Sequence, residues 1–91
     1  MAVIRNSAQK KSLISRLKRV EGQARGIQQM ILDDRPCESI AQQMSAARKA
    51  FNKAFYEMVA CALEEHAKEG KSAAELSRRV REISKILAKY S

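Results

Sequence analysis

Residues 37–58 read CESIAQQMSAARKAFNKAFYEM and form the longest regular pattern in the sequence. Their apolar side chains recur at alternating intervals of three and four residues, which places them along one face of an α-helix. This face comprises Ile40, Met44, Ala47, Phe51, Ala54 and Met58. The pattern extends from Pro36 toward Gly70, and roughly thirty residues at about 1.5 Å each give a helix close to 50 Å long. A single neighbouring helix cannot cover that length.

Two further helical patterns flank this one. The preceding segment carries the same spacing at Leu13, Leu17, Val20, Ala24, Ile27 and Ile31. The following segment carries it at Leu76, Val80, Ile83, Leu87 and Tyr90. Asn6 with Gln9 is a start signal for the first helix, residues 33–36 separate it from the second, and Ser72 with Glu75 forms a capping box that opens the third. Strand-type alternation does not occur, so we predict an all-α protomer of three helices.

Length and composition restrict the classes of protein to which this chain can belong. Residues 1–91 make a single domain with a modest core, so we expect the helices to find partners on other chains. Apolar runs fall far short of the roughly 20 residues that cross a bilayer, which argues against a membrane protein. Cys37 and Cys61 are too few for a secreted disulfide scaffold, and no signal peptide is evident. We therefore expect free thiols and a cytoplasmic location.

The positive charge is concentrated in the first helical segment. The formal net charge is +8, and residues 1–31 hold seven Lys and Arg against one Glu, whereas residues 32–91 hold eleven against nine acidic residues. The first helix carries Lys10, Lys11, Arg16, Lys18, Arg19 and Arg25 around its apolar face, and the second adds Arg48, Lys49 and Lys53. Such groups neutralise phosphates but do not select bases. The charge predicts a nucleic-acid partner, read through DNA shape and the spacing of basic patches across an oligomer.

Two motifs resemble those of a known family. The run from Arg16 to Gln23, RLKRVEGQ, resembles the first-helix signature of the copper-, nickel/cobalt-, formaldehyde- and persulfide-responsive repressors, the CsoR/RcnR/FrmR family. Cys37, followed by QQMSAAR at residues 42–48, resembles that family's second motif, and the three-segment layout covers the whole chain. The resemblance implies antiparallel pairing of second helices in a homodimer, a flat homotetramer, and operator DNA that is released when an effector binds.

The resemblance also assigns residues to the DNA-binding face. It places the family's DNA-contacting positions on Arg16, Arg19 and Arg48. Charge alone adds Lys18 and Lys49 to this predicted face on double-stranded DNA.

The predicted sensor site departs from each branch of the family. At two positions of the second helix the copper branch has His and then Cys, and the nickel/cobalt branch has His at both. This chain has Ala62 and His66 at these positions. The persulfide branch has Cys at the position of His66, and the formaldehyde branch uses an N-terminal Pro where this chain would offer Ala2. Cys37 is the one position that suits every branch. Cys37 and His66 together would give Cu(I), Ni(II) or Zn(II) a thiolate and an imidazole, which is an incomplete ligand set.

A thiol switch is the preferred hypothesis for the effector. Cys37 lies in a first helical turn, where amide N–H groups and the helix dipole favour the thiolate. Cys61 lies about 120° around a straight helix from Cys37, but a supercoiled 3.5-residue repeat puts both on one face. They are about 36 Å apart within one helix, so they cannot react with each other in one chain. In this hypothesis Cys37 reacts with a sulfur donor or with an electrophile such as formaldehyde, and Cys61 of the partner subunit resolves the product. The alternatives are a core thiol without a role at Cys61, and a metal-sensing site of Cys37 and His66, with or without Cys61.

The residue types in the sequence argue against an enzyme. One His, two separated Cys and the absence of a Gly-rich phosphate loop leave little with which to build catalysis, so we predict that the chain is not an enzyme and requires no cofactor. A constitutive architectural nucleic-acid binder, with no effector, remains the alternative of another class.

Overall fold

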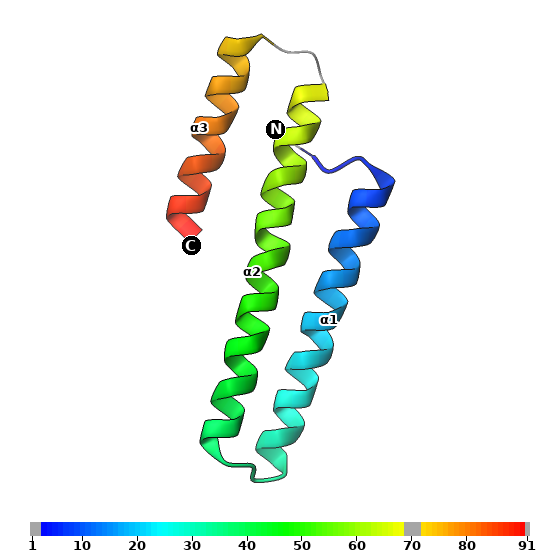
Figure 1. Ribbon diagram of the computed structural model, residues 1–91, viewed down its shortest axis with the longest axis vertical. Helices are drawn as coiled ribbons and strands as arrows, with labels where there is room; N and C mark the ends of the chain where they lie inside the picture. Colours follow the sequence, from blue (N-terminus) through cyan, green and yellow to red (C-terminus); the bar gives the residue numbers. More distant parts are fainter. Residues whose placement is uncertain (1–2, 69–71, 91) are drawn as a thin grey trace.

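The computed structural model describes residues 3–68 and 72–90, with side chains for all of these except 66–68. It contains α1 (Ser7–Leu32), α2 (Cys37–Lys68) and α3 (Ala73–Tyr90). Figure 1 shows α1 antiparallel to α2 and α3 on the other side of α2, beside its second half. The described residues form no strand, which confirms the predicted all-α class. None of the helices described is long and apolar enough to cross a membrane.

The starts of α1 and α3 follow the predicted capping signals. The side chain of Asn6 accepts a hydrogen bond from the backbone N–H of Gln9 at 3.0 Å. The hydroxyl of Ser72 accepts one from the backbone N–H of Glu75 at 3.2 Å. Each bond satisfies an amide that has no partner within its own helix, so both helices begin where local sequence predicts.

The turn between α1 and α2 has a feature that the sequence analysis did not predict. Asp34 takes a left-handed conformation with φ of 55°. The N–H of Arg35 donates to the carbonyl of Met30 at 3.0 Å, and that of Asp34 donates to Ile31 at 3.2 Å. These two bonds form a Schellman motif, which normally has glycine at the left-handed position. The motif ends α1 and lets α2 begin directly after Pro36.

The protomer is a thin, elongated body with a small core. Its extents are 56 × 27 × 15 Å, and its radius of gyration is 17.1 Å, against about 12 Å for a compact domain of this length. The main core cluster contains Leu13, Ala54 and Cys61, with Ile4 and Met58 packed against it. It lies between α1 and the second half of α2.

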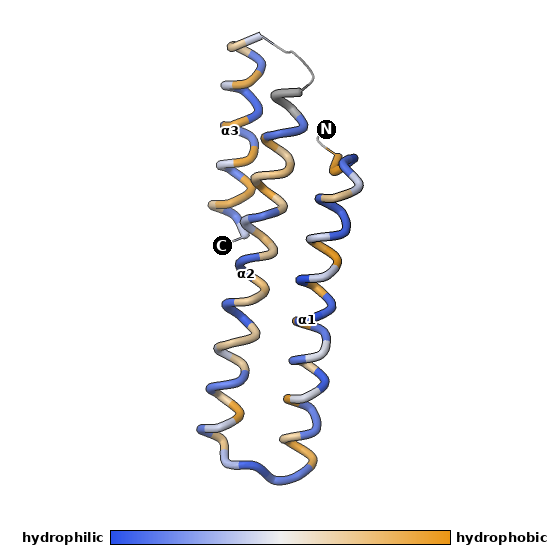
Figure 2. Tube along the Cα trace, turned by 45° about the vertical axis from the view of Figure 1, so that its right-hand side comes forward, coloured by the Kyte–Doolittle hydropathy of each residue, from blue (hydrophilic) through white to orange (hydrophobic). Residues whose placement is uncertain are grey.

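The predicted apolar faces are regular but only partly covered. Figure 2 shows apolar segments recurring along all three helices. Leu13 and Ile27 are buried, whereas Phe51 on α2 is 52% exposed and Val80 on α3 is 43% exposed. The spacing thus predicted the faces, but a single protomer does not bury them.

Candidate nucleic-acid interface and sensor thiols

A groove between α1 and α2 collects basic side chains. It has a volume of about 310 Å³, and its cationic residues come from both helices, with two small alanines of α2 beside them. The lining residues are Arg16, Arg19, Ala46, Lys49, Ala50 and Lys53. We call this feature the basic groove. Four cations around one groove produce a local positive potential that attracts phosphate.

The predicted DNA-binding residues divide into two groups in the structure. Arg16, Arg19 and Lys49 line the basic groove together, whereas Lys18 and Arg48 are exposed outside it. Lys18 directly precedes Arg19, and Arg48 directly precedes Lys49. Each therefore points about 100° around its helix from the groove residue that follows it. Lys53 also lines the groove. The charge pattern included it in the basic cluster of the second helix, one turn after Lys49, but it was not among the residues assigned to the DNA-binding face.

An acidic residue at the edge of the basic groove connects the two helices. The Nε atom of Arg16 lies 2.7 Å from Oε2 of Glu57. The hydroxyl of Ser12 donates a hydrogen bond to the other carboxylate oxygen, Oε1, at 2.6 Å. Ser12 and Glu57 are 45 residues apart in the sequence, and no local pattern predicted this cluster.

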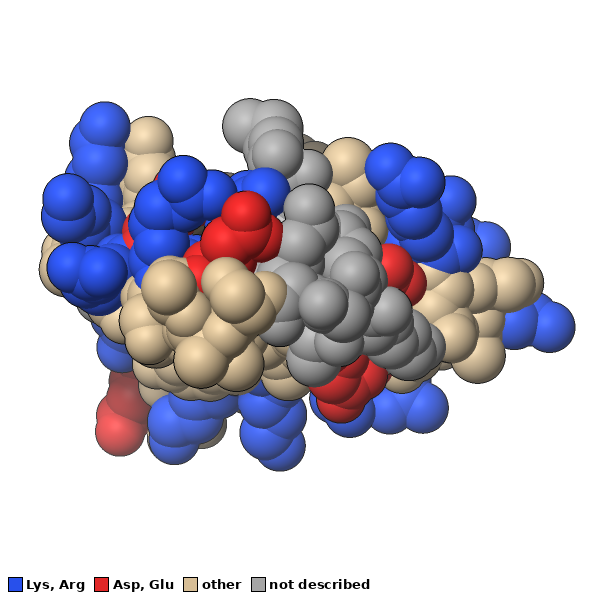
Figure 3. All heavy atoms as spheres, turned by 90° about the horizontal axis from the view of Figure 1, so that it is seen from above, with Lys and Arg blue, Asp and Glu red and all other residues tan. Residues whose placement is uncertain are grey.

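Basic side chains also lie outside the groove. Figure 3 looks down the long axis of the molecule and shows Lys and Arg on several sides of its outline, with few acidic side chains among them. This distribution agrees with the formal net charge of +8. The protomer therefore has a positive field around the groove as well as within it.

Cys37 is the first residue of α2 and is exposed. This position agrees with the predicted location in a first helical turn, and it leaves the thiol open to solutes. The described residues contain no group of three His, Cys, Asp or Glu side chains that could hold a metal ion. The side chain of His66 lies outside the described residues. Within the described part of one protomer, Cys37 thus brings a single soft donor to a metal.

Cys61 has a different environment from Cys37. It is only 3% exposed and packs in the core beside Leu13. Burial raises the pKa of the Cys61 thiol, and the carboxylates of Glu57 and Glu64 raise it further. A buried neutral thiol is a poor nucleophile, which favours the core-packing interpretation over a resolving role. Cys37 and Cys61 lie 24 residues apart on α2, about 36 Å, so they cannot meet within one chain.

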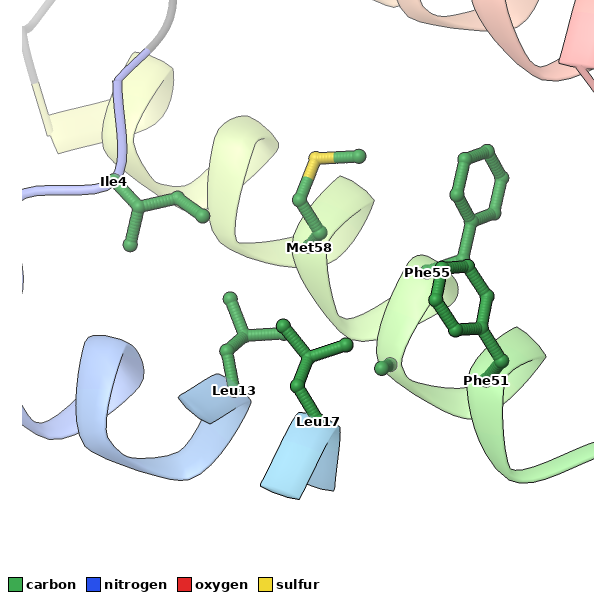
Figure 4. A pocket seen from close by; sticks show the side chains of 7 residues that line it. Ile4, Leu13, Leu17, Phe51, Phe55 and Met58 are labelled. Carbon is green, nitrogen blue, oxygen red and sulfur yellow. The ribbon is translucent and has the colours of Figure 1, made fainter. Parts of the chain in front are cut away.

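An apolar hollow adjoins the core cluster. Its volume is about 290 Å³, and it is lined by Ile4, Leu13, Leu17, Phe51, Ala54, Phe55 and Met58. Figure 4 shows side chains of α1, α2 and the segment before α1 converging on it. The helical spacing placed Phe51 on the apolar face of α2, and in the structure Phe51 and Phe55 border an open hollow. We call it the apolar hollow.

Comparison with known proteins identifies the family of the chain. Residues 9–89 match the family described as metal-sensitive transcriptional repressor. The chain is also 41% identical over 63 residues to the copper-sensing transcriptional repressor CsoR of Bacillus subtilis (strain 168). That alignment covers 69% of this chain and 58% of the relative. No solved structure matches.

The family match bears on two sequence predictions. It extends over nearly the whole chain and includes both motifs on which the resemblance was based. It confirms the resemblance to the CsoR/RcnR/FrmR repressors and the prediction that the chain is not an enzyme. This chain belongs to the family of metal-sensitive transcriptional repressors.

Proposed function

We propose that this protein is a cytoplasmic repressor that binds operator DNA through the basic groove and releases it when an effector binds at Cys37. The convergence of four cations from two helices on one groove is the observation that carries the proposal. Each cation that meets a phosphate displaces condensed counterions, so binding weakens steeply with salt. Lys18 and Arg48 extend the basic surface beyond the groove and add phosphate contacts on a larger duplex.

A metal ion is the first candidate effector. The similarity to a copper-sensing repressor favours metal over reactive sulfur or formaldehyde, which the sequence analysis had preferred. The exposed sulfur of Cys37 is a soft ligand, which suits Cu(I) better than hard cations. The described residues of one protomer do not make a closed metal site. We therefore propose that a second protomer supplies the remaining donors, with His66 of the partner subunit as the first candidate.

Covalent modification of Cys37 is the second candidate. The exposure of Cys37 and the alanine at position 62, where metal-sensing branches have histidine, favour it. In this alternative a persulfide donor or formaldehyde modifies the thiol. The burial of Cys61 leaves it without access to act as the resolving thiol.

A single experiment separates these candidates. The reduced protein first selects duplexes from a random DNA pool. Operator affinity and intact mass, under native and denaturing conditions, are then measured after exposure to Cu(I), Ni(II), Zn(II), formaldehyde or a persulfide donor. We expect Cu(I) to release the DNA with a mass adduct that denaturation removes. Cys37→Ser should bind DNA and fail to release it, whereas the matched control Cys61→Ala should still respond.

The other outcomes are equally specific. A mass increase that survives denaturation and maps to Cys37, together with DNA release, would replace the metal proposal by covalent sensing. DNA affinity that no effector changes would identify a constitutive architectural binder. A protein that selects no duplex at low salt would refute the DNA-binding part of the proposal.

A further inference from the structure

We propose that Glu57 and Ser12 are positioning residues that hold the Arg16 guanidinium ready to receive a DNA phosphate. The inference rests on the proposed DNA-binding function of the basic groove. It adds an uncharged residue, Ser12, and an acidic residue, Glu57, to a site whose charged residues are otherwise cations. Glu57 lies on α2 and holds Arg16 on α1 through the 2.7 Å contact with Nε. Ser12 holds the same carboxylate by a hydrogen bond to its other oxygen, Oε1.

The atoms used in the ion pair leave Arg16 competent to bind phosphate. A guanidinium has five N–H donors, of which one is on Nε and four are on the two Nη atoms. Glu57 contacts the Nε side, and the described residues supply no second ion-pair partner for Arg16. The Nη edge can therefore still make the paired hydrogen bonds by which arginine binds phosphate. The side chain of Arg16 is 47% exposed and lines the basic groove, so it is accessible to a ligand there.

The helix registers place the cluster at one end of the basic groove. Lys49, Lys53 and Glu57 occupy successive turns of one face of α2, and Ser12 lies one turn before Arg16 on α1. The carboxylate thus follows directly after the row of ammonium groups. Its negative charge discourages a phosphate from lying beyond Arg16, so it marks the end of the phosphate path along the groove.

Restraint of Arg16 should strengthen binding because a free arginine has many rotamers. Contact with phosphate would otherwise have to select one of them at an entropic cost. Here the Glu57 carboxylate, only 25% exposed on its side chain, and the Ser12 hydroxyl select it before DNA arrives. An exposed pair such as Arg25 with Glu21 lies within α1 alone and cannot restrain an arginine between two helices.

DNA-binding titrations on the full chain test the inference. Duplexes retained by the wild-type protein are titrated with wild type, Ser12→Ala, Glu57→Gln and Arg16→Ala at several salt concentrations. We expect Ser12→Ala and Glu57→Gln each to weaken binding by about three- to tenfold, in the range of coupled neighbouring residues. Ser12→Ala is decisive because it changes no charge. Thermal unfolding followed by circular dichroism verifies that each variant is folded.

Two matched controls carry the same chemical changes elsewhere. Ser15→Ala removes an exposed hydroxyl of α1, and Glu64→Gln removes a carboxylate of α2 whose partner is the neutral Gln9. Both should bind DNA within about twofold of wild type, as expected for surface changes away from the contact.

A double variant shows whether Glu57 acts through Arg16. In the Arg16→Ala background, Glu57→Gln should leave DNA affinity unchanged or raise it, because only the removal of a repelling charge remains. Equal weakening in both backgrounds, or folded Ser12→Ala and Glu57→Gln proteins that bind like their controls, would overturn the inference. Wild-type protein that does not bind DNA, or Arg16→Ala protein that binds normally with an unchanged salt dependence, would instead refute the proposed DNA face.

Discussion

The two thiols of this chain share one helix but have opposite chemical properties. Cys37 is exposed in the first turn of α2, next to the turn that ends at Pro36. Cys61 is buried against α1, and both burial and nearby carboxylates raise its pKa. Only the thiolate is nucleophilic and binds metals, so the exposure of Cys37, together with the burial and raised pKa of Cys61, favours Cys37 as the sensor.

Alkylation should distinguish the two thiols. We expect iodoacetamide at pH 7.5 to modify Cys37 much faster than Cys61 in the folded protein, with rates about tenfold or more apart, because Cys61 is shielded and stays protonated. Digestion and mass spectrometry give the rate at each site. In urea the two rates should become similar, and Cys37→Ser should retain only the slow site. Equal rates in native buffer would contradict the assigned difference.

At the scale of the elements, the helix ends are specified by contacts within a few residues. The caps at Asn6 and Ser72 and the break at residues 33–36 were all readable from the sequence. The left-handed Asp34 was not, because aspartate reaches this region less readily than glycine and asparagine and gives no strong signal.

Asp34→Gly should stabilise the protein. Glycine adopts a positive φ without a steric penalty, and after subtraction of its greater entropy in the unfolded chain we expect a gain of about 0.5–1 kcal/mol. Urea unfolding followed by circular dichroism measures the change. The control Asp33→Gly alters a residue with φ of −86° and should give no such gain. A loss of stability in Asp34→Gly would show that the carboxylate, rather than the backbone, governs this turn.

At the scale of the whole molecule, a single chain leaves much apolar surface exposed. The apolar hollow and the half-exposed faces of α2 and α3 lie on a body only 15 Å thick in its shortest dimension. Exposed apolar patches of this kind mark association surfaces. The exposed surface agrees with the homodimer through antiparallel α2 helices and the flat homotetramer that the family resemblance predicts.

Phe51→Glu should weaken this association. The side chain of Phe51 borders the apolar hollow and is half exposed in the protomer, so a carboxylate there would be desolvated in an assembled protein. Sedimentation equilibrium should give a mass well above 10.2 kDa for wild type and a shift toward that value for the variant. Ser15→Glu adds the same charge to an exposed position of α1 outside the hollow and should leave the mass unchanged. A monomeric wild-type protein would refute the prediction of an oligomer.

The sequence alone was enough to predict the three helices, two of their starts, the break between α1 and α2, and the place of Cys37 in a first helical turn. These features depend on periodicity and on hydrogen bonds that span three to five residues, so a short segment of the sequence specifies each of them. The family motifs lie within such stretches too, and they indicated the repressor family before any contact between helices was known.

Which residues meet between the helices became visible only in the three-dimensional packing. It placed Lys53 in the basic groove and Lys18 and Arg48 outside it, and it joined Glu57 to Arg16. It also turned Cys61 toward α1 instead of leaving it on an open face. The physical reason is rotation: neighbouring residues point about 100° apart, and a broad apolar stripe does not specify how far each helix turns toward its neighbour. Packing of Leu13 and Ala54 in the core sets that rotation, and the basic groove follows from it.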